Sequence, residues 1–177
     1  RIVRRNFKGP NSTTQLIEPK DLLRKWIHNY QIFVNQMYFY LFLDKLPLKK
    51  LMAIAKEENW QAALTGYEAA NQIQTSSSAA PPMIYLWPKS SSESSFRRIL
   101  SRLENQHRFI PVGKDSNLII LEPFQKEAVF YGSRKVKGLT IVSPIQLFLD
   151  LYGMDQGKTL INSLAPFWEE NKVPYEI

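Results

Sequence analysis

The segment from Ser143 to Gly153 constrains the fold more than any other part of the sequence. Pro144 suits the first turn of a helix because its missing N–H needs no partner there, and Ser143 with Gln146 has the spacing of a capping box. Apolar side chains then occupy two sides of the predicted helix: Ile145, Leu147, Phe148, Leu149, Leu151 and Tyr152. Such a helix must be buried on almost all sides, and Gly153 is predicted to end it in a left-handed conformation.

Other helices are predicted from proline and capping signals. Pro19 opens a helix whose apolar residues recur at spacings of three and four as far as Phe33, and Pro47 opens a second helix. Thr65 and Glu68 have the capping-box spacing for a third helix, in which the Thr65 hydroxyl accepts from the Glu68 N–H. Two more helices are predicted, one beginning at Phe96 and one over residues 156–170.

Short apolar segments are predicted to be strands. Met37–Leu43 is apolar throughout and rich in aromatic residues, which is typical of a strand buried on both faces. Further strands are predicted at Met83–Trp87, Arg108–Val112, Leu118–Leu121, Ala128–Tyr131 and Leu139–Val142. Helices interleaved with short strands indicate an α/β or α+β domain in which helices flank a mixed β-sheet.

Positive charge is concentrated near the N-terminus. The net charge is +7 at pH 7, and residues 1–50 contain ten lysine and arginine residues against three acidic ones. This asymmetry is consistent with an anionic partner, a neighbouring module or a solvated basic face.

The sequence has no cysteine, which excludes disulfides and Cys-based metal sites and favours a cytoplasmic location. The longest apolar run, Met37–Leu43, is far short of the roughly 20 residues of a membrane helix.

The sequence contains few groups suited to catalysis. His28 and His107 fall on separate predicted helices without carboxylates at metal-ligand spacing, and there is no glycine-rich phosphate loop. We therefore expect neither a metal nor a cofactor.

Asp150 lies in the last turn of the apolar helix, where the helix dipole disfavours an anion. We expect an arginine, a lysine or a backbone N–H to compensate it in a structural salt bridge or hydrogen bond.

A cluster of carboxylates leaves one enzymatic alternative open. Asp115, Glu122 and Glu127 lie near successive predicted strands, and Lys114 and Lys126 stand beside them. Clustered carboxylates with a lysine are typical of metal-dependent nucleases. The alternative function is thus a nucleic-acid-processing enzyme of restriction-endonuclease-like fold.

Two longer segments resemble a known family. The first is Ala63–Ala70 followed by the strand at Met83–Leu86, and the second is Gly138–Leu151, preceded by Leu118–Leu121 and Val129–Phe130. Together they resemble the AbiEi family of antitoxins from type IV toxin–antitoxin systems, and the similarity covers about residues 18–165. The matching residues are Leu64, Thr65, Gly66, Ala69, Ala70, Ser143, Pro144, Gln146 and Asp150.

The resemblance implies a non-enzymatic regulator. In this family a DNA-binding, autorepressing winged helix is joined to a domain that counters a nucleotidyltransferase-like toxin. Residues 18–177 are expected to form the second domain, and residues 1–17 to be a basic remnant of an upstream winged helix, because the chain begins with arginine rather than methionine. Four basic residues are expected to contact DNA phosphates: Arg1, Arg4, Arg5 and Lys8. A plain nucleic-acid-binding accessory domain that uses the basic N-terminal third is the third hypothesis.

Overall fold

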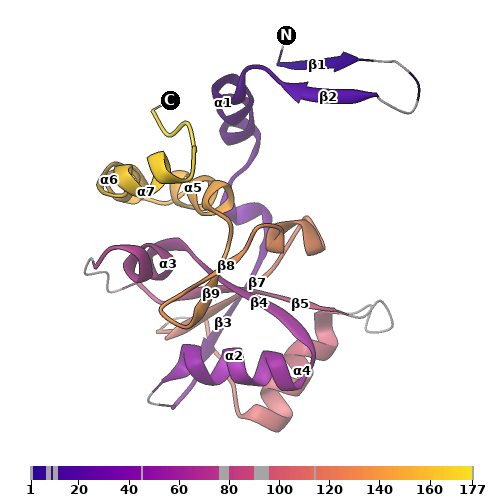
Figure 1. Ribbon diagram of the computed structural model, residues 1–177. Helices are drawn as coiled ribbons and strands as arrows, with labels where there is room; N and C mark the ends of the chain where they lie inside the picture. The colour runs from indigo at the N-terminus through magenta and orange to yellow at the C-terminus, as the bar shows by residue number, and fades with distance from the viewer. Residues whose placement is uncertain are drawn as a thin grey trace.

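The computed structural model describes residues 2–6, 9, 12–44, 46–75, 80–89, 96–113 and 115–176. Near the N-terminus, β1 (Val3–Asn6) pairs antiparallel with β2 (Thr13–Leu16) in a two-stranded sheet of its own. Figure 1 shows that this hairpin extends away from the rest of the molecule.

The rest of the described chain is built on a seven-stranded sheet of order β6-β3-β7-β5-β4-β9-β8. Its strands are β3 (Gln36–Leu41), β4 (Trp60–Thr65), β5 (Met83–Pro88), β6 (Ile110–Pro111), β7 (Leu118–Glu122), β8 (Arg134–Val136) and β9 (Leu139–Ile141). The pairs β5–β7 and β4–β9 are parallel, and the other pairs are antiparallel. The predicted mixed sheet flanked by helices is confirmed.

Helices cover both faces of this sheet (Figure 1). One face packs against α2 (Pro47–Glu57) and α4 (Phe96–His107), and the other against α3 (Gly66–Ile73), α5 (Pro144–Tyr152), α6 (Gly157–Ser163) and α7 (Ala165–Glu170). The first helix, α1 (Pro19–Asn29), packs against α5. The sheet has a hydrophobic core on each face, and successive side chains of β5 point into these two cores in turn. Ile84 and Leu86 face α2 and α4, whereas Met83 and Tyr85 face the opposite side.

The apolar helix α5 is buried as predicted. Its buried residues are Leu147, Phe148, Leu149, Asp150 and Leu151, whereas Ile145 is 44% exposed. Gly153 has a φ of −83°, so the predicted left-handed conformation is wrong. A Cβ on Gly153 would lie 3.4 Å from the backbone nitrogen of Ile32, at the edge of ordinary van der Waals contact.

The start of α5 gives a direct stability test. Ser143 Oγ accepts a hydrogen bond from the Gln146 N–H at 3.2 Å, as the capping-box spacing predicts. Ser143→Ala should lower the free energy of unfolding by about 0.5–2 kcal/mol, because the cap is lost. Urea unfolding measures this loss. Ser12→Ala, at an exposed position before β2, is the control and should stay within about 0.5 kcal/mol of the wild type. Equal losses in both variants would show that the cap contributes nothing.

Several predicted elements differ in the structure. Ala128–Tyr131, predicted as a strand, belongs to the 3₁₀ helix η3 (Lys126–Phe130), in which the Ala128 N–H donates to the Gln125 carbonyl at 3.0 Å. The single helix predicted over residues 156–170 is divided at Leu164 into α6 and α7. Proline lacks the N–H that a continuous helix would use, and Pro166 lies at the start of α7.

The first helix is also shorter than its apolar spacing predicts. It ends at Asn29, and the chain continues through the 3₁₀ helix η2 (Ile32–Val34), in which Phe33 is 66% exposed. Ile32, one residue earlier, is fully buried. Tyr30 and Gln31 have extended backbone between α1 and η2, so the helical spacing no longer identifies the buried side chain.

Candidate functional site

The most polar part of the core surrounds Asp150, which is fully buried in the last turn of α5. Its Oδ1 accepts hydrogen bonds from the Tyr30 hydroxyl at 2.6 Å and from Gln146 Nε2 at 2.9 Å. Its Oδ2 accepts from Thr65 Oγ1 at 2.5 Å, and the Tyr85 hydroxyl lies 3.2 Å from Oδ1 and 3.3 Å from Oδ2. Both carboxylate oxygens are therefore occupied by donors from the protein.

A buried asparagine extends this network. Asn35 Nδ2 donates to the Ile32 carbonyl at 2.8 Å, and it lies 3.1 Å from the Tyr85 hydroxyl and 3.2 Å from the Tyr30 hydroxyl. The Asn35 Oδ1 accepts from the Phe124 N–H at 3.0 Å. We call the six connected side chains the Asp150 centre: Tyr30, Asn35, Thr65, Tyr85, Gln146 and Asp150.

The Asp150 centre connects elements that are far apart in the sequence. Tyr30 directly follows α1, Thr65 ends β4, and Tyr85 lies in the middle of β5. Gln146 and Asp150 are four residues apart on α5, a spacing that places two side chains on one helix face. The helix that follows the N-terminal hairpin is thus linked by side chains to the sheet and to α5.

Among the residues that the structure describes, no lysine or arginine donates to Asp150. Burial raises the pKa of Asp150 to about 6, although hydrogen bonds from Thr65, Tyr30, Gln146 and Tyr85 act in the opposite direction. Burial and the negative charge of Asp150 raise the pKa values of Tyr30 and Tyr85, so both phenols remain protonated donors at neutral pH. The expected arginine, lysine or backbone N–H is replaced by hydroxyl and amide donors from side chains.

The structure corrects the role predicted for Thr65. Thr65 is the N-cap residue of α3, but its side chain makes no capping hydrogen bond. Its hydroxyl donates to Asp150 instead. The Glu68 carboxylate accepts from Gln72 Nε2 at 2.6 Å and from Asn71 Nδ2 at 3.3 Å. The capping box predicted at Thr65 and Glu68 is therefore wrong, because each side chain has a different partner.

Gln146 is also used differently from its predicted role. Its backbone N–H donates to Ser143, but its side chain turns inward to Asp150 and lies 3.0 Å from the Tyr30 hydroxyl. One half of the predicted capping box is confirmed, and the second half is replaced by contacts in the Asp150 centre.

The other matching residues shape the backbone around the centre. Gly66 begins α3 at a φ of +63°, a left-handed conformation that favours glycine. Ala69 and Ala70 are buried on α3, which packs against α5. Leu64 is buried in β4, and Pro144 is the first residue of α5. These residues lie near side chains of the centre in the sequence, and in the described structure none of them donates a hydrogen bond to Asp150.

Of the four predicted DNA-contacting side chains, the structure describes that of Arg4, which lies on the N-terminal hairpin and not in the Asp150 centre. Arg4 is exposed on β1 and pairs with Gln15 of β2. Arg5 is also in β1, but its side chain is outside the described part of the structure, as are residues Arg1 and Lys8. The hairpin that carries Arg4 extends away from the main sheet (Figure 1).

Two of the three carboxylates of the nuclease hypothesis accept hydrogen bonds from aromatic side chains. Glu122 accepts from the Tyr38 hydroxyl at 3.0 Å, and Glu127 accepts from Trp87 Nε1 at 3.2 Å. Asp115 is exposed. Within the described ranges, no group of three or more histidine, aspartate or glutamate side chains is arranged to hold a metal ion.

Sequence reasoning missed Tyr30, Asn35 and Tyr85. Tyr30 and Tyr85 occupy apolar positions in their helix and strand patterns. At such positions a tyrosine is interpreted as a hydrophobic core residue. A buried tyrosine nevertheless needs a partner for its hydroxyl. The need of each buried hydroxyl for a hydrogen-bond partner was the one available sequence signal for the centre. It predicts a polar residue inside the core beside each phenol.

Comparisons with known proteins give one match. Residues 15–163 match the model of a family described as transcriptional regulators, AbiEi antitoxins of type IV toxin–antitoxin systems. No curated protein and no solved structure matches the chain. Among the helices of the described chain, none has the length and apolar character needed to span a membrane. Because the matched region includes most of the sequence, the chain belongs to the AbiEi family of antitoxins and transcriptional regulators.

Proposed function

We propose that this chain is a non-enzymatic, cytoplasmic regulatory domain of a prokaryotic antitoxin that also represses transcription. In this proposal residues 18–177 counter a nucleotidyltransferase-like toxin. Residues 1–17 continue from an upstream winged helix that reads the operator. Membership of the AbiEi family supports the general role of antitoxin and regulator.

The observation that carries the proposal is the Asp150 centre. Asp150 is fully buried, and both its oxygens accept hydrogen bonds from side chains of the protein. A carboxylate in this state is suited to holding elements together rather than to binding a metal ion or a substrate. Through Tyr30, the centre anchors the end of α1, and with it the arm that precedes α1, to the body of the domain. In this proposal the centre fixes the end of α1 to the body that carries the antitoxin role.

The hairpin supports the DNA-contacting part of the proposal. All four residues of β2 are exposed, and Arg4 is exposed on the opposite strand. Contacts to phosphates add affinity without reading sequence. We therefore assign Arg1, Arg4, Arg5 and Lys8 to phosphates beside the operator, and the reading of bases to the winged helix.

This assignment predicts different DNA binding by the chain and by a longer protein that includes the winged helix. The chain alone should bind operator and scrambled DNA equally, with dissociation constants no tighter than about 10⁻⁶ M near physiological salt. The longer protein should prefer its operator. Replacing the four basic residues by glutamine in the longer protein should weaken binding to both DNAs and flatten its salt dependence. Titrations at two salt concentrations measure these effects, and neutralisation of a co-expressed toxin should survive the change.

A matched variant separates local contacts from net charge. It replaces four exposed lysines of the body by glutamine: Lys49, Lys50, Lys158 and Lys172. This variant should keep the salt slope of the unmodified protein. Operator-selective binding by the chain alone would contradict the proposal, because the reading element would then lie within these residues. Loss of neutralisation with the arm variant, but not with the control, would contradict the assignment of the antitoxin role to residues 18–177.

A further inference from the structure

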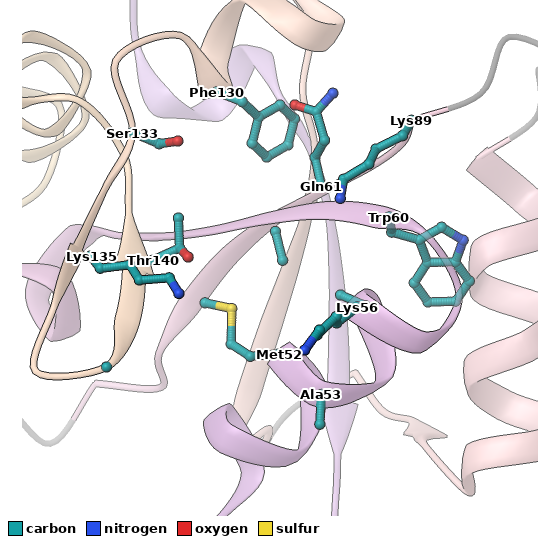
Figure 2. A pocket seen from close by; sticks show the side chains of 13 residues that line it. Met52, Ala53, Lys56, Trp60, Gln61, Lys89, Phe130, Ser133, Lys135 and Thr140 are labelled. Carbon is teal, nitrogen blue, oxygen red and sulfur yellow. The ribbon is translucent and has the colours of Figure 1, made fainter.

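A recess of about 540 Å³ lies on the molecule between α2, β4 and the β8–β9 hairpin. Three lysines line it from different elements: Lys56 from α2, Lys89 from the end of β5, and Lys135 from β8. Figure 2 shows their side chains extending over the same space from separate walls. This recess is distinct from the Asp150 centre, none of whose side chains lines it.

The described lining of the recess is positively charged. It includes no aspartate or glutamate among the residues that the structure describes. Within the described ranges, none of the three lysines forms an ion pair, since the pairs involve Arg24, Arg102 and His107. Three ammonium groups around one volume repel one another, so a bound anion with several charges would relieve this repulsion.

The remaining walls offer both polar and apolar contacts. The hydroxyls of Ser133 and Thr140 and the amide of Gln61 supply neutral hydrogen-bonding groups. Met52 and the Phe130 ring supply apolar surface at the same recess (Figure 2). Charged groups on one part of the lining and apolar groups on another suit a ligand that has an anionic end and an apolar or aromatic end.

The volume favours a small molecule over a nucleic acid strand. Pockets for small ligands and cofactors typically measure about 300–1,000 Å³, and this recess falls in that range. Proteins that bind single strands without sequence preference instead use a positive groove that follows the backbone over several nucleotides. Here the three lysines line one recess, whose volume corresponds to a single nucleotide-sized ligand.

We propose that this recess binds a phosphorylated small molecule of nucleotide size, with its phosphates on Lys56, Lys89 and Lys135. The apolar end of the ligand packs against Met52 and Phe130. Lysine ammonium groups are suited to this role because they act as compact point charges for phosphate oxygens. The site requires no contribution from the N-terminal arm, so it is independent of the proposed DNA contacts.

Calorimetric titration of the full chain with ATP, tripolyphosphate and adenosine tests this site. ATP should bind most tightly near physiological salt, tripolyphosphate more weakly, and adenosine without detectable heat. The double variant Lys56→Gln/Lys135→Gln should weaken ATP binding by about tenfold or more, since each hydrogen bond to a charged phosphate contributes substantially. Both lysines are exposed, so urea unfolding should show the same midpoint as for the wild type.

A second double variant with the same net charge is the control. It is Lys25→Gln/Lys49→Gln, at two exposed lysines outside the recess, and it should bind ATP like the wild type. Equal weakening in both double variants would overturn the proposal, because net charge alone would then explain binding. Absence of ATP binding at millimolar concentration would also overturn it. So would displacement of ATP by a short single-stranded oligonucleotide that binds more tightly and depends on Lys56 and Lys135.

Discussion

Replacing Phe148 by alanine should lower the free energy of unfolding by about 3–5 kcal/mol, which is one of the two largest effects expected in this chain. Phe148 is fully buried on α5, and its ring meets the Trp168 ring edge to face with centroids 5.8 Å apart. The truncation removes this contact and leaves a cavity between α5 and α7. Urea unfolding followed by circular dichroism gives the change in free energy.

Phe33 provides a matched control for the same substitution. Phe33→Ala removes the same atoms, but Phe33 is 66% exposed, so the change should be within about 0.5 kcal/mol. If Phe148→Ala does not fold, Phe148→Leu keeps most of the volume and should show a smaller loss that can still be measured. Similar losses for Phe33→Ala and Phe148→Ala would contradict the burial of α5.

The helix starts could be predicted from the sequence because their signals are local. Pro19, Pro47 and Pro144 are the first residues of α1, α2 and α5, as predicted. Proline fixes its own φ and lacks an N–H, so its preference for the first turn depends little on distant residues. For the same reason Pro166 marks the break between α6 and α7, a signal that the single-helix prediction overlooked.

The strand β4 could not be found in the same way. Its sequence, Trp60-Gln-Ala-Ala-Leu-Thr65, contains two alanines and only one aromatic residue, so it lacks the composition typical of strands. It is a strand because β5 pairs with it on one side and β9 on the other. Both partners lie later in the chain, and their pairing overrides the weak local preference.

The Asp150 centre was predicted only in part, for a related reason. Thr65, Gln146 and Asp150 were singled out, but the first two were assigned to local capping boxes. The Thr65 hydroxyl instead donates to a residue 85 positions away. A buried carboxylate without a nearby cation needs several donors, and only the fold determines which donors reach it.

The burial of Asp150 should make the folded state less stable as the pH rises from about 4 to above 6. The pKa of Asp150 is raised from 3.8 to about 6 in the folded state. Well below pH 3.8 the Asp150 carboxyl is protonated whether the chain is folded or unfolded, so its burial then does not lower the free energy of unfolding. Between the two pKa values the folded state holds the proton more tightly, so stability falls with pH and becomes constant above about 6. The difference in pKa corresponds to about 3 kcal/mol.

Asp150→Asn should remove this pH dependence, because the amide does not titrate. The free energy of unfolding of the wild type minus that of Asp150→Asn should decrease by about 2.4 kcal/mol between pH 4 and pH 7, because the unfolded state is already partly ionised at pH 4. Urea unfolding of both proteins at intervals of half a pH unit measures the difference, in which the titration of all other groups cancels. Asp155→Asn, at an exposed position, should leave the pH profile of the wild type unchanged. A constant difference between the wild type and Asp150→Asn would contradict the raised pKa.

The hydrogen bonds to Asp150 predict a further change in the same profile. The Tyr30 hydroxyl donates to Oδ1 at 2.6 Å and lowers the pKa of Asp150, although less than burial raises it. Tyr30→Phe removes this donor while keeping the ring, so the folded-state pKa of Asp150 should rise further. The loss of stability should then extend to a higher pH and become larger than in the wild type, because the interval between the two pKa values widens. In the double variant Tyr30→Phe/Asp150→Asn, the pH dependence of the free energy of unfolding that Tyr30→Phe adds should vanish. If Tyr30→Phe acted only by disturbing the structure, its loss of stability would remain in the double variant at every pH.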